Sequence, residues 1–260
     1  MNYKKELEAA KEAAILAGKM IMDIYESSED LSIEYKDGDM PLTRADKSAN
    51  AIIIKILKER FPDYAILSEE EKDNKERLNN PYCFVIDPLD GTKEFIKRNG
   101  QFTVNIALSY EHESVMGVIY VPTTEVIYFA SKGAGAFLKD KVGIRRIKVS
   151  DVIDKKELRV VMSNSHGCEK MNQLLEKYHL THFVKVGSSL KGCMVAEGSA
   201  DIYYRYNPTM EWDTAAMQCI VEEAGGIFRQ MDGSVMYYNR NHCLNEKGFY
   251  LVNCSANIIQ

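Results

Sequence analysis

The sequence lacks any apolar run of about 20 residues, the length that crosses a bilayer as a helix, so we expect no integral membrane segment. It also lacks the pattern of a secretory signal peptide, because acidic and basic residues alternate along residues 4–12. Six cysteines are present, yet no two stand at the two-residue spacing that zinc and redox sites favour. We therefore expect reduced thiols and a cytoplasmic protein.

An excess of positive charge is absent as well. The formal net charge is -5, which excludes a general basic surface that wraps a long nucleic acid. A small anionic substrate stays compatible with this charge, because a local pocket can be cationic on an acidic protein. What the chain does have is 260 residues, 45% of them hydrophobic and 27% charged, which suffices for one large domain or two packed halves.

Hydrophobic periodicity predicts two helices in the first quarter of the chain. Apolar residues recur at steps of three and four over residues 7–24, and a similar segment begins near Asp46 and ends before Pro62. Shorter apolar and alternating runs then predict strands, and we expect those from residue 102 to residue 130 to form an antiparallel meander. These strands are predicted at 64–67, 82–86, 102–110, 115–121 and 126–130.

The pattern of predicted elements changes after a polar segment around residues 150–157. From there, short apolar strands alternate with helices, and the Gly225-Gly226 pair ends the last helix. We therefore predict two parts, an α+β half at 1–150 and an α/β half at 151–260. In the second half, the strands are predicted at 159–162, 183–186, 202–205, 227–228 and 249–252, and the helices at 188–196 and 214–224.

The most informative segment is Asp87-Pro88-Leu89-Asp90-Gly91-Thr92, which directly follows the predicted strand 82–86. Pro88 fixes its own φ and Gly91 permits a sharp turn, so two carboxylates and a backbone carbonyl can converge on one point. Hard divalent cations bind such groups of oxygens. Asp-Pro and Asp-Gly are also ordinary turn dipeptides, so this segment alone leaves a plain turn open.

Two further acidic groups stand at the ends of predicted elements. Ser68-Glu69-Glu70-Glu71 follows a strand, and Glu211-Trp212-Asp213 precedes a helix. Each has a simpler interpretation, a solvated acidic loop for the first group and a helix N-cap for the second. The occurrence of all three groups at element ends favours a shared site for a divalent cation.

Together these segments resemble the inositol monophosphatase and fructose-bisphosphatase superfamily of Mg²⁺-dependent, Li⁺-sensitive phosphatases. The resemblance rests on DPLDGT at 87–92, the upstream SEE at 68–70 and the downstream WDTAA at 212–216, in matching order over residues 36–226. It implies an α/β fold layered α-β-α-β-α. The N-terminal antiparallel half would carry most metal ligands, and the C-terminal mixed-sheet half would carry Asp213 and the substrate-binding residues.

Two segments narrow the resemblance. DGTKEF at 90–95 and GSSLK at 187–191 are similar to those of the 3′(2′),5′-bisphosphate nucleotidases of bacterial sulfur metabolism, whereas inositol monophosphatases typically carry DGTTNF. This implies hydrolysis of the 3′-phosphate of adenosine 3′,5′-bisphosphate or of 3′-phosphoadenylyl sulfate. The sequence does not rank these two substrates.

The resemblance also assigns roles to residues. A metal-activated water attacks phosphorus, Thr92 orients that water, and Asp46 accepts its proton through Thr92. Glu69 joins these catalytic residues, and Glu70 stays open as an alternative base. Two or three Mg²⁺ ions and inhibition by Li⁺ are expected. The implied metal ligands are Glu69, Asp87, the Leu89 carbonyl, Asp90 and Asp213.

The phosphate that is not cleaved needs cationic or hydrogen-bonding partners. Lys191 and Arg205 supply charge, and Ser188 supplies a hydroxyl at the start of a predicted helix. Family inositol monophosphatases tend to place a glutamate near the position of Arg205, so a cation there favours a second phosphate. Surface solvation is the usual state of a single lysine or arginine, and a loop histidine often has no role. The predicted substrate-binding set is Leu89, Asp90, Gly91, Thr92, His166, Ser188, Lys191, Arg205 and Asp213.

Other interpretations stay open at this point. An inositol monophosphatase or sugar bisphosphatase of the same superfamily is the enzymatic alternative, and a catalytically inactive nucleotide or metal sensor is the non-enzymatic one. A calcium module at 37–39 lacks the ligand spacing and terminal glutamate of an EF-hand. We expect a small nucleotide as partner, no long nucleic acid, and a monomer or homodimer. By resemblance, peripheral contact with the inner membrane also stays open.

Overall fold

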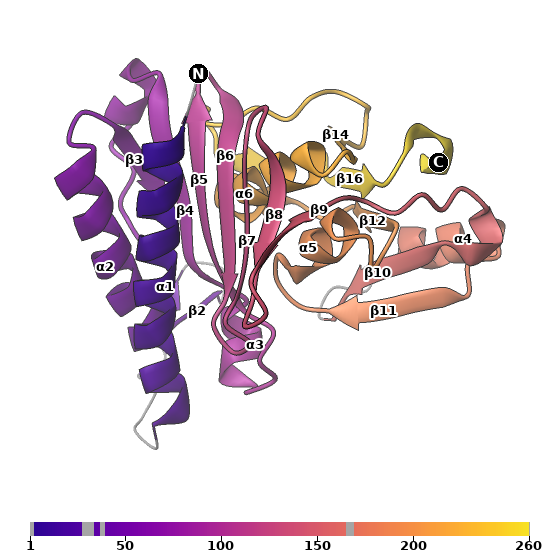
Figure 1. The fold of residues 1–260 in the computed structure, drawn as a ribbon, viewed down its shortest axis with the longest axis horizontal. Helices are drawn as coiled ribbons and strands as arrows, with labels where there is room; N and C mark the ends of the chain where they lie inside the picture. The colour runs from indigo at the N-terminus through magenta and orange to yellow at the C-terminus, as the bar shows by residue number, and fades with distance from the viewer. Residues whose placement is uncertain (1–2, 28–33, 37–39, 165–168, 260) are drawn as a thin grey trace.

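Five layers of alternating helices and sheets make up the computed structural model, which describes residues 3–27, 34–36, 40–164 and 169–259 (Figure 1). Helices α1 (Lys4–Glu26) and α2 (Arg44–Arg60) form the first layer, and a seven-stranded sheet forms the second. Helices α5 (Leu190–Ala196) and α6 (Glu211–Glu223) lie between this sheet and a five-stranded sheet, and α4 (Glu169–Lys177) covers the far side. The predicted α-β-α-β-α order is therefore confirmed.

Helices α1 and α2 follow the predicted periodicity. Small alanines occupy most of the buried positions of α1, so α2 and the sheet can approach it closely. Helix α2 begins at Arg44, where the Thr43 hydroxyl accepts a hydrogen bond from the Ala45 N–H at 3.2 Å. Asp46 accepts one from the Thr43 N–H at 2.7 Å, which completes a capping box at this helix start.

The seven-stranded sheet has the simple order β3-β4-β5-β6-β7-β8-β9, and only the β3–β4 pair is parallel. The strands predicted from 64 to 130 are confirmed, whereas β8 and β9 were not predicted. Both faces of the sheet are covered, because α1 and α2 pack on one side and α6 on the other. The strands are β3 (Ala65–Ser68), β4 (Tyr82–Asp90), β5 (Thr103–Tyr110), β6 (Glu113–Val121), β7 (Val126–Ser131), β8 (Gly135–Lys139) and β9 (Ile144–Ile147).

The five-stranded sheet has the order β11-β10-β12-β16-β14. Strand β10 pairs in parallel with β11 and β12, and β16 pairs antiparallel with β12 and β14, so the sheet is mixed as predicted. All five of its strands were predicted. They are β10 (Arg159–Ser163), β11 (His182–Val186), β12 (Ile202–Arg205), β14 (Ile227–Gln230) and β16 (Phe249–Val252).

The remaining elements are shorter or were missed by the periodicity analysis. Helices α5 (Leu190–Ala196) and α6 (Glu211–Glu223) confirm the predicted helices, and α6 begins three residues earlier than expected. Helices α3 (Thr92–Ile96) and α4 (Glu169–Lys177) were not predicted. Short pairs and 3-10 turns complete the described chain: β1 (Glu34–Lys36), β2 (Met40–Leu42), β13 (Thr209–Met210), β15 (Leu244–Asn245), η1 (Glu76–Asn79), η2 (Lys155–Glu157) and η3 (Ser255–Asn257).

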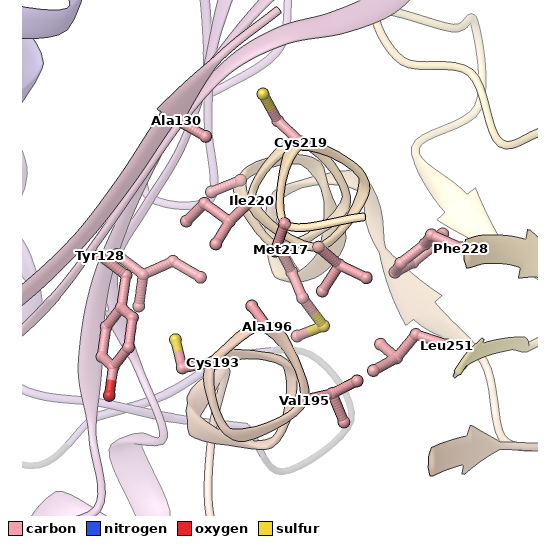
Figure 2. Close-up of a cluster of buried hydrophobic side chains, with 14 of the residues drawn as sticks. Tyr128, Ala130, Cys193, Val195, Ala196, Met217, Cys219, Ile220, Phe228 and Leu251 are labelled. Carbon is pink, nitrogen blue, oxygen red and sulfur yellow. The ribbon is translucent and has the colours of Figure 1, made fainter. Parts of the chain in front are cut away.

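The central core joins the two sheets through α5 and α6. Figure 2 shows Ile220 and Met217 of α6 between Tyr128 and Ala130 of β7 on one side and Phe228 and Leu251 of the five-stranded sheet on the other. Helix α6 can lie this close to the seven-stranded sheet because Gly117 of β6 has no side chain. A Cβ at that position would stand 2.4 Å from the carbonyl oxygen of Ala216.

The described cysteines are all free thiols, and three of the five are buried. Every described helix is too short or too polar to span a bilayer. The predicted boundary near residue 150 falls between the last strand of the seven-stranded sheet, which ends at Ile147, and β10. The division into two halves stays a prediction. Helix α6, which belongs to the second half, packs directly on the seven-stranded sheet of the first half.

Candidate active site

A β-bulge at the end of β4 sets the position of the first two carboxylates. Asp87 pairs with Asn105 of β5 and Asp90 pairs with Thr103, so three steps along β4 match two along β5. Without the extra residue, side chains three positions apart would point to opposite faces of the sheet. The bulge instead turns both Asp87 and Asp90 toward α6, while Leu89 joins the core on the other face. The prediction had ended this strand at residue 86.

Gly91 makes the sharp turn that follows. Its φ of 95° lies in the left-handed region, and a Cβ would stand 3.1 Å from the Gln101 carbonyl oxygen and 3.2 Å from the Ser188 Cβ. Helix α3 begins directly after it, at Thr92. The turn therefore brings Thr92 back over the Leu89 carbonyl, at an oxygen-to-oxygen distance of 3.4 Å.

The third carboxylate comes from the other half of the chain. Asp213 stands in the first turn of α6, and its Oδ2 accepts a hydrogen bond from the Met210 N–H at 2.7 Å. One oxygen each of Asp87, Asp90 and Asp213 lies within 4.8 Å of the others. The first turn of a helix is a favourable place for an anion. The N-cap interpretation of the group 211–213 is therefore wrong, because Met210 is the N-cap and Asp213 is the third residue of the helix. Asp213 instead completes a capping box from inside the first turn, and its position is compatible with the shared-site interpretation.

Electrostatics make this cluster unfavourable without a counter-charge. Burial, with Glu69 and then Asp90 nearby, raises the pKa of Asp87 well above its usual range. Burial and Asp90 raise the pKa of Asp213 to about 8. Two carboxylates about 4 Å apart repel by roughly 4 kcal/mol at an effective dielectric near 20. A divalent cation would reverse that repulsion, and an oxygen-only donor set fits Mg²⁺.

The three carboxylates open on one cavity of about 280 Å³ between the two halves of the chain. Glu69 lines the same cavity, at the start of the loop that follows β3, and its N–H donates to the Ile86 carbonyl at 3.1 Å. The structure thus brings together most of the residues that the sequence analysis selected. Those in the cavity wall are Glu69, Asp87, Leu89, Asp90, Gly91, Thr92, Ser188, Lys191, Arg205 and Asp213.

Asp46 reaches the cavity through Thr92. The Thr92 hydroxyl donates to Asp46 Oδ1 at 3.2 Å, and the Thr43 hydroxyl donates to Asp46 Oδ2 at 2.6 Å. Burial raises the pKa of Asp46, while the hydrogen bonds from Thr43 and Thr92 oppose that rise. A buried carboxylate with a raised pKa accepts a proton more readily than an exposed one.

Two cationic side chains line the same cavity as the carboxylates. Arg205 at the end of β12 lines the cavity, and its buried Nε has no hydrogen-bond acceptor among the described residues. Lys191 is buried, and its ammonium donates to the Ser188 carbonyl at 2.5 Å. Burial and the neighbouring Arg205 lower the pKa of Lys191 to about 8, although Asp90 opposes the shift. His166 lies outside the described residues.

Ser188 has an unusual backbone. Its φ of 46° is rare for a residue other than glycine, and the preceding Gly187 N–H donates to the Gln101 side-chain oxygen at 2.8 Å. The Lys191 ammonium, bonded to the carbonyl of Ser188, helps to hold this conformation. Residues in such strained conformations often occur at ligand sites.

Three polar residues beside Asp90 were not predicted as part of the site. Thr103 and Asn105 of β5 and Ser189 before α5 are buried. Thr103 donates to Asn105, Asn105 donates to Ser189 and to the Asp90 carboxylate, and Ser189 also donates to Asp90. A signal was present, since Thr103 and Asn105 stand on the polar face of the alternating segment 102–110. The partner that explains their polarity, Ser189, lies 84 positions further along the chain.

This fold and this acidic cavity define a phosphatase of the inositol monophosphatase type. Residues 2–256 match the Inositol monophosphatase family, and the chain belongs to that family. It is therefore a phosphatase, one kind of hydrolase.

Comparison with individual relatives shows which members of the family this chain is similar to. The chain is 38% identical to the 3′(2′),5′-bisphosphate nucleotidase CysQ of Salmonella typhimurium. The match extends over 244 residues, which are 94% of this chain and 98% of that protein. The crystal structure of CysQ from Bacteroides thetaiotaomicron is 36% identical, with a TM-score of 0.86 over 97% of this chain and 99% of that one. Inositol monophosphatase from Anabaena is 26% identical, with a TM-score of 0.78 over 98% and 93%. The predicted resemblance to the bisphosphate nucleotidases is confirmed.

Proposed function

We propose that this protein is a Mg²⁺-dependent 3′(2′),5′-bisphosphate nucleotidase that hydrolyses adenosine 3′,5′-bisphosphate to AMP and inorganic phosphate. Water adds to the 3′-phosphorus, and the bond from phosphorus to the ribose 3′-oxygen breaks. In the net reaction one hydrogen of the water ends on the ribose oxygen as the 3′-hydroxyl group of AMP, and the other stays on the phosphate. The observation that carries the proposal is that an acidic cluster and the cation Arg205 face one cavity. In a bisphosphate substrate, one phosphate would lie at the acidic cluster and the other at Arg205.

The acidic cluster supports the metal part of the proposal. Glu69, Asp87, Asp90, Asp213 and the Leu89 carbonyl would hold two or three Mg²⁺ ions, as the resemblance implies. When bound, Mg²⁺ neutralises charge on the phosphoryl oxygens and makes a water more acidic at neutral pH. The raised pKa values of Asp87 and Asp213 support a cation at this position, because these groups are unfavourable as close, uncompensated anions.

Asp46 and Thr92 handle the proton in this proposal. Thr92 has its hydroxyl between the Leu89 carbonyl and Asp46 Oδ1, so it can pass a proton to Asp46 while it holds the attacking water in place. Asp46 suits this role because burial raises its pKa, and Thr43 fixes its other oxygen.

The second phosphate is assigned to Arg205 and Ser188. The buried Nε of Arg205 gains an acceptor when a phosphate binds, and a charge-assisted hydrogen bond of this kind typically contributes about 1.5–3 kcal/mol. Lys191 adds positive charge to the cavity wall, while its ammonium stays bonded to the Ser188 carbonyl. A single-phosphate substrate such as an inositol phosphate leaves Arg205 without that partner.

A substrate panel tests the proposal directly. Phosphate release is measured from adenosine 3′,5′-bisphosphate, 3′-phosphoadenylyl sulfate, AMP, inositol 1-phosphate and fructose 1,6-bisphosphate, with Mg²⁺, with EDTA, and with Mg²⁺ plus Li⁺. We expect turnover of adenosine 3′,5′-bisphosphate in Mg²⁺ alone, with AMP as product. A higher kcat/KM for inositol 1-phosphate or the sugar bisphosphate would replace the proposal with its enzymatic alternative. No turnover of any compound would favour the inactive sensor.

A further inference from the structure

A buried chain of polar side chains runs alongside Asp90. The Ser189 hydroxyl donates to Asp90 Oδ2 at 2.7 Å, and the Asn105 amide nitrogen lies 2.9 Å from the Ser189 hydroxyl and 3.3 Å from Asp90 Oδ2. The Thr103 hydroxyl donates to the Asn105 amide oxygen at 2.9 Å and lies 3.3 Å from the Ser188 hydroxyl. Ser189, Asn105 and Thr103 are each no more than 1% exposed.

The direction of these hydrogen bonds follows from the groups involved. An ionised carboxylate only accepts, so the Ser189 hydroxyl hydrogen is committed to Asp90 and its oxygen accepts from the Asn105 NH₂ group. Thr103 then fixes which end of the Asn105 amide carries the nitrogen, because the Thr103 hydroxyl donates to the amide oxygen. The hydrogen bonds therefore run in one direction, from Thr103 to Asn105, from Asn105 to Ser189, and from Ser189 to Asp90.

Both donors act on the same carboxylate oxygen. Ser189 and Asn105 both donate hydrogen bonds to Asp90 Oδ2. These two bonds fix the orientation of the carboxylate plane. A carboxylate fixed in this way can present its remaining lone pairs to the neighbouring carboxylates Asp87 and Asp213 and to an ion between them.

The two donors come from opposite parts of the fold. Asn105 stands in the middle of the seven-stranded sheet, directly opposite Asp87, whereas Ser189 precedes α5 in the second half of the chain. The Ser189 hydroxyl is also 3.4 Å from the backbone carbonyl of Asp213. Asp90 is thus held at the junction where the second half of the chain delivers Asp213.

We propose that Asn105 and Ser189 are positioning residues that fix the Asp90 carboxylate for metal binding, and that they do so only when the two sheets are docked around α5 and α6. This inference rests on the proposed Mg²⁺ site. Neither residue touches the substrate in this assignment, and the loss of either weakens metal binding. Residues that orient a metal ligand typically contribute about 10- to 100-fold to metal affinity or activity.

Ser189→Ala and Asn105→Ala test the inference, and Ser109→Ala is the matched control. Ser109 is on the same face of β5 as Asn105, is 1% exposed, and has a hydroxyl without a hydrogen-bond partner among the described residues. For each variant, the unfolding temperature is measured as Mg²⁺ is titrated into EDTA-treated protein, and Mg²⁺ binding is measured by calorimetry. The rate of phosphate release from adenosine 3′,5′-bisphosphate is then measured across the same Mg²⁺ range.

We expect Ser189→Ala to raise the Mg²⁺ concentration for half-maximal stabilisation by roughly 10-fold or more, and Ser109→Ala to leave it unchanged. Activity of Ser189→Ala should be recovered by excess Mg²⁺, with an unchanged KM for the nucleotide at saturating metal. Because Ser189→Ala removes a single hydroxyl, it remains the deciding variant if Asn105→Ala fails to fold.

A purely structural role would give a different result. Ser189→Ala would then lower the unfolding temperature equally with and without Mg²⁺ and keep the wild-type Mg²⁺ titration midpoint, and this outcome overturns the inference. If the wild-type protein itself gains no stability from Mg²⁺, the proposed metal site is contradicted, and the positioning role is rejected with it.

Discussion

At the residue scale, the hydroxyl group of Thr92 is expected to contribute strongly to the rate of hydrolysis. It lies between the Leu89 carbonyl and Asp46, and the proposed proton transfer passes through it. Thr92→Val keeps the shape and removes the hydroxyl, so we expect kcat to fall by roughly 10²- to 10⁴-fold with little change in KM. Steady-state kinetics of phosphate release measure this.

Thr92→Ser is the matched control, since it keeps the hydroxyl, and it should retain most of the activity. The stabilisation by Mg²⁺ should be the same in both variants, because neither removes a carboxylate. Equal loss of kcat in Thr92→Ser and Thr92→Val would show that the methyl group, not the hydroxyl, matters.

Arg205 is the residue that we expect to distinguish a bisphosphate from a single phosphate. Arg205→Ala removes the guanidinium whose buried Nε has no acceptor among the described residues. One lost charge-assisted hydrogen bond corresponds to a KM for adenosine 3′,5′-bisphosphate that is roughly 10- to 100-fold higher. The comparison is p-nitrophenyl phosphate, which has one phosphate and whose KM should change little. A similar rise in KM for both compounds would remove Arg205 from the second-phosphate site.

At the element scale, the close contact of α6 with β6 decides where Asp213 lies. Gly117→Ala would place a Cβ 2.4 Å from the Ala216 carbonyl oxygen, and backbone on both sides leaves little room to relax. We expect a loss of about 3 kcal/mol, the upper end of typical overpacking costs. For a chain of this size that corresponds to a fall in unfolding temperature of roughly 6–12 °C.

The size of this effect is judged against Gly133→Ala. A Cβ at Gly133 meets nothing within 4 Å, so the cost there comes only from its φ of 82° and amounts to about 1 kcal/mol. Gly117→Ala should also weaken Mg²⁺ binding, since it displaces the helix that carries Asp213, whereas Gly133→Ala should not. Thermal unfolding with and without Mg²⁺ measures both effects. An equal or smaller loss in Gly117→Ala would contradict the close packing.

The elements themselves were predictable to different degrees. Helices α1 and α2 and the strands that begin near 82, 103, 115 and 126 have strong periodicity over many residues, and their predicted positions hold. Helix α4 buries only Met171 and Leu174, so its apolar pattern was too short to identify. The bulge at 87–90 was not predicted, because a bulge is defined by the register with the neighbouring strand and not by the strand itself.

At the scale of the whole molecule, the acidic cluster links stability to pH and metal. Burial and neighbouring carboxylates raise the pKa of Asp87 and Asp213, for Asp213 to about 8, above the value near 3.9 in an unfolded chain. Between these two values the folded protein binds more protons than the unfolded one, so stability without metal falls as the pH rises. The stabilising contribution of protonation is complete below about pH 4 and is lost as the pH approaches 8.

Mg²⁺ should reverse this trend, because it binds the deprotonated carboxylates. We expect the rise in unfolding temperature caused by Mg²⁺ to be small at pH 5.5 and largest near pH 8.5. Thermal unfolding of EDTA-treated protein, with and without added Mg²⁺, measures this across the pH range. An increment that is the same at every pH would mean that these carboxylates do not change protonation when the metal binds.

The sequence by itself determined the residue types at the site and the turn that follows Asp90. Gly91 permits the turn that follows β4. The acidic groups at the ends of predicted elements, with the resemblance they carry, identified the phosphatase family. Those features depend on neighbours along the chain, which periodicity and turn chemistry reveal.

Only the tertiary structure decided which of those residues meet. Asp213 reaches Asp87 and Asp90 because α6 crosses the seven-stranded sheet over Gly117, and Asn105 reaches Ser189 because α5 lies against the same face. Such contacts join positions many tens of residues apart. They depend on strand register and on helix packing between the two sheets, which local sequence does not encode.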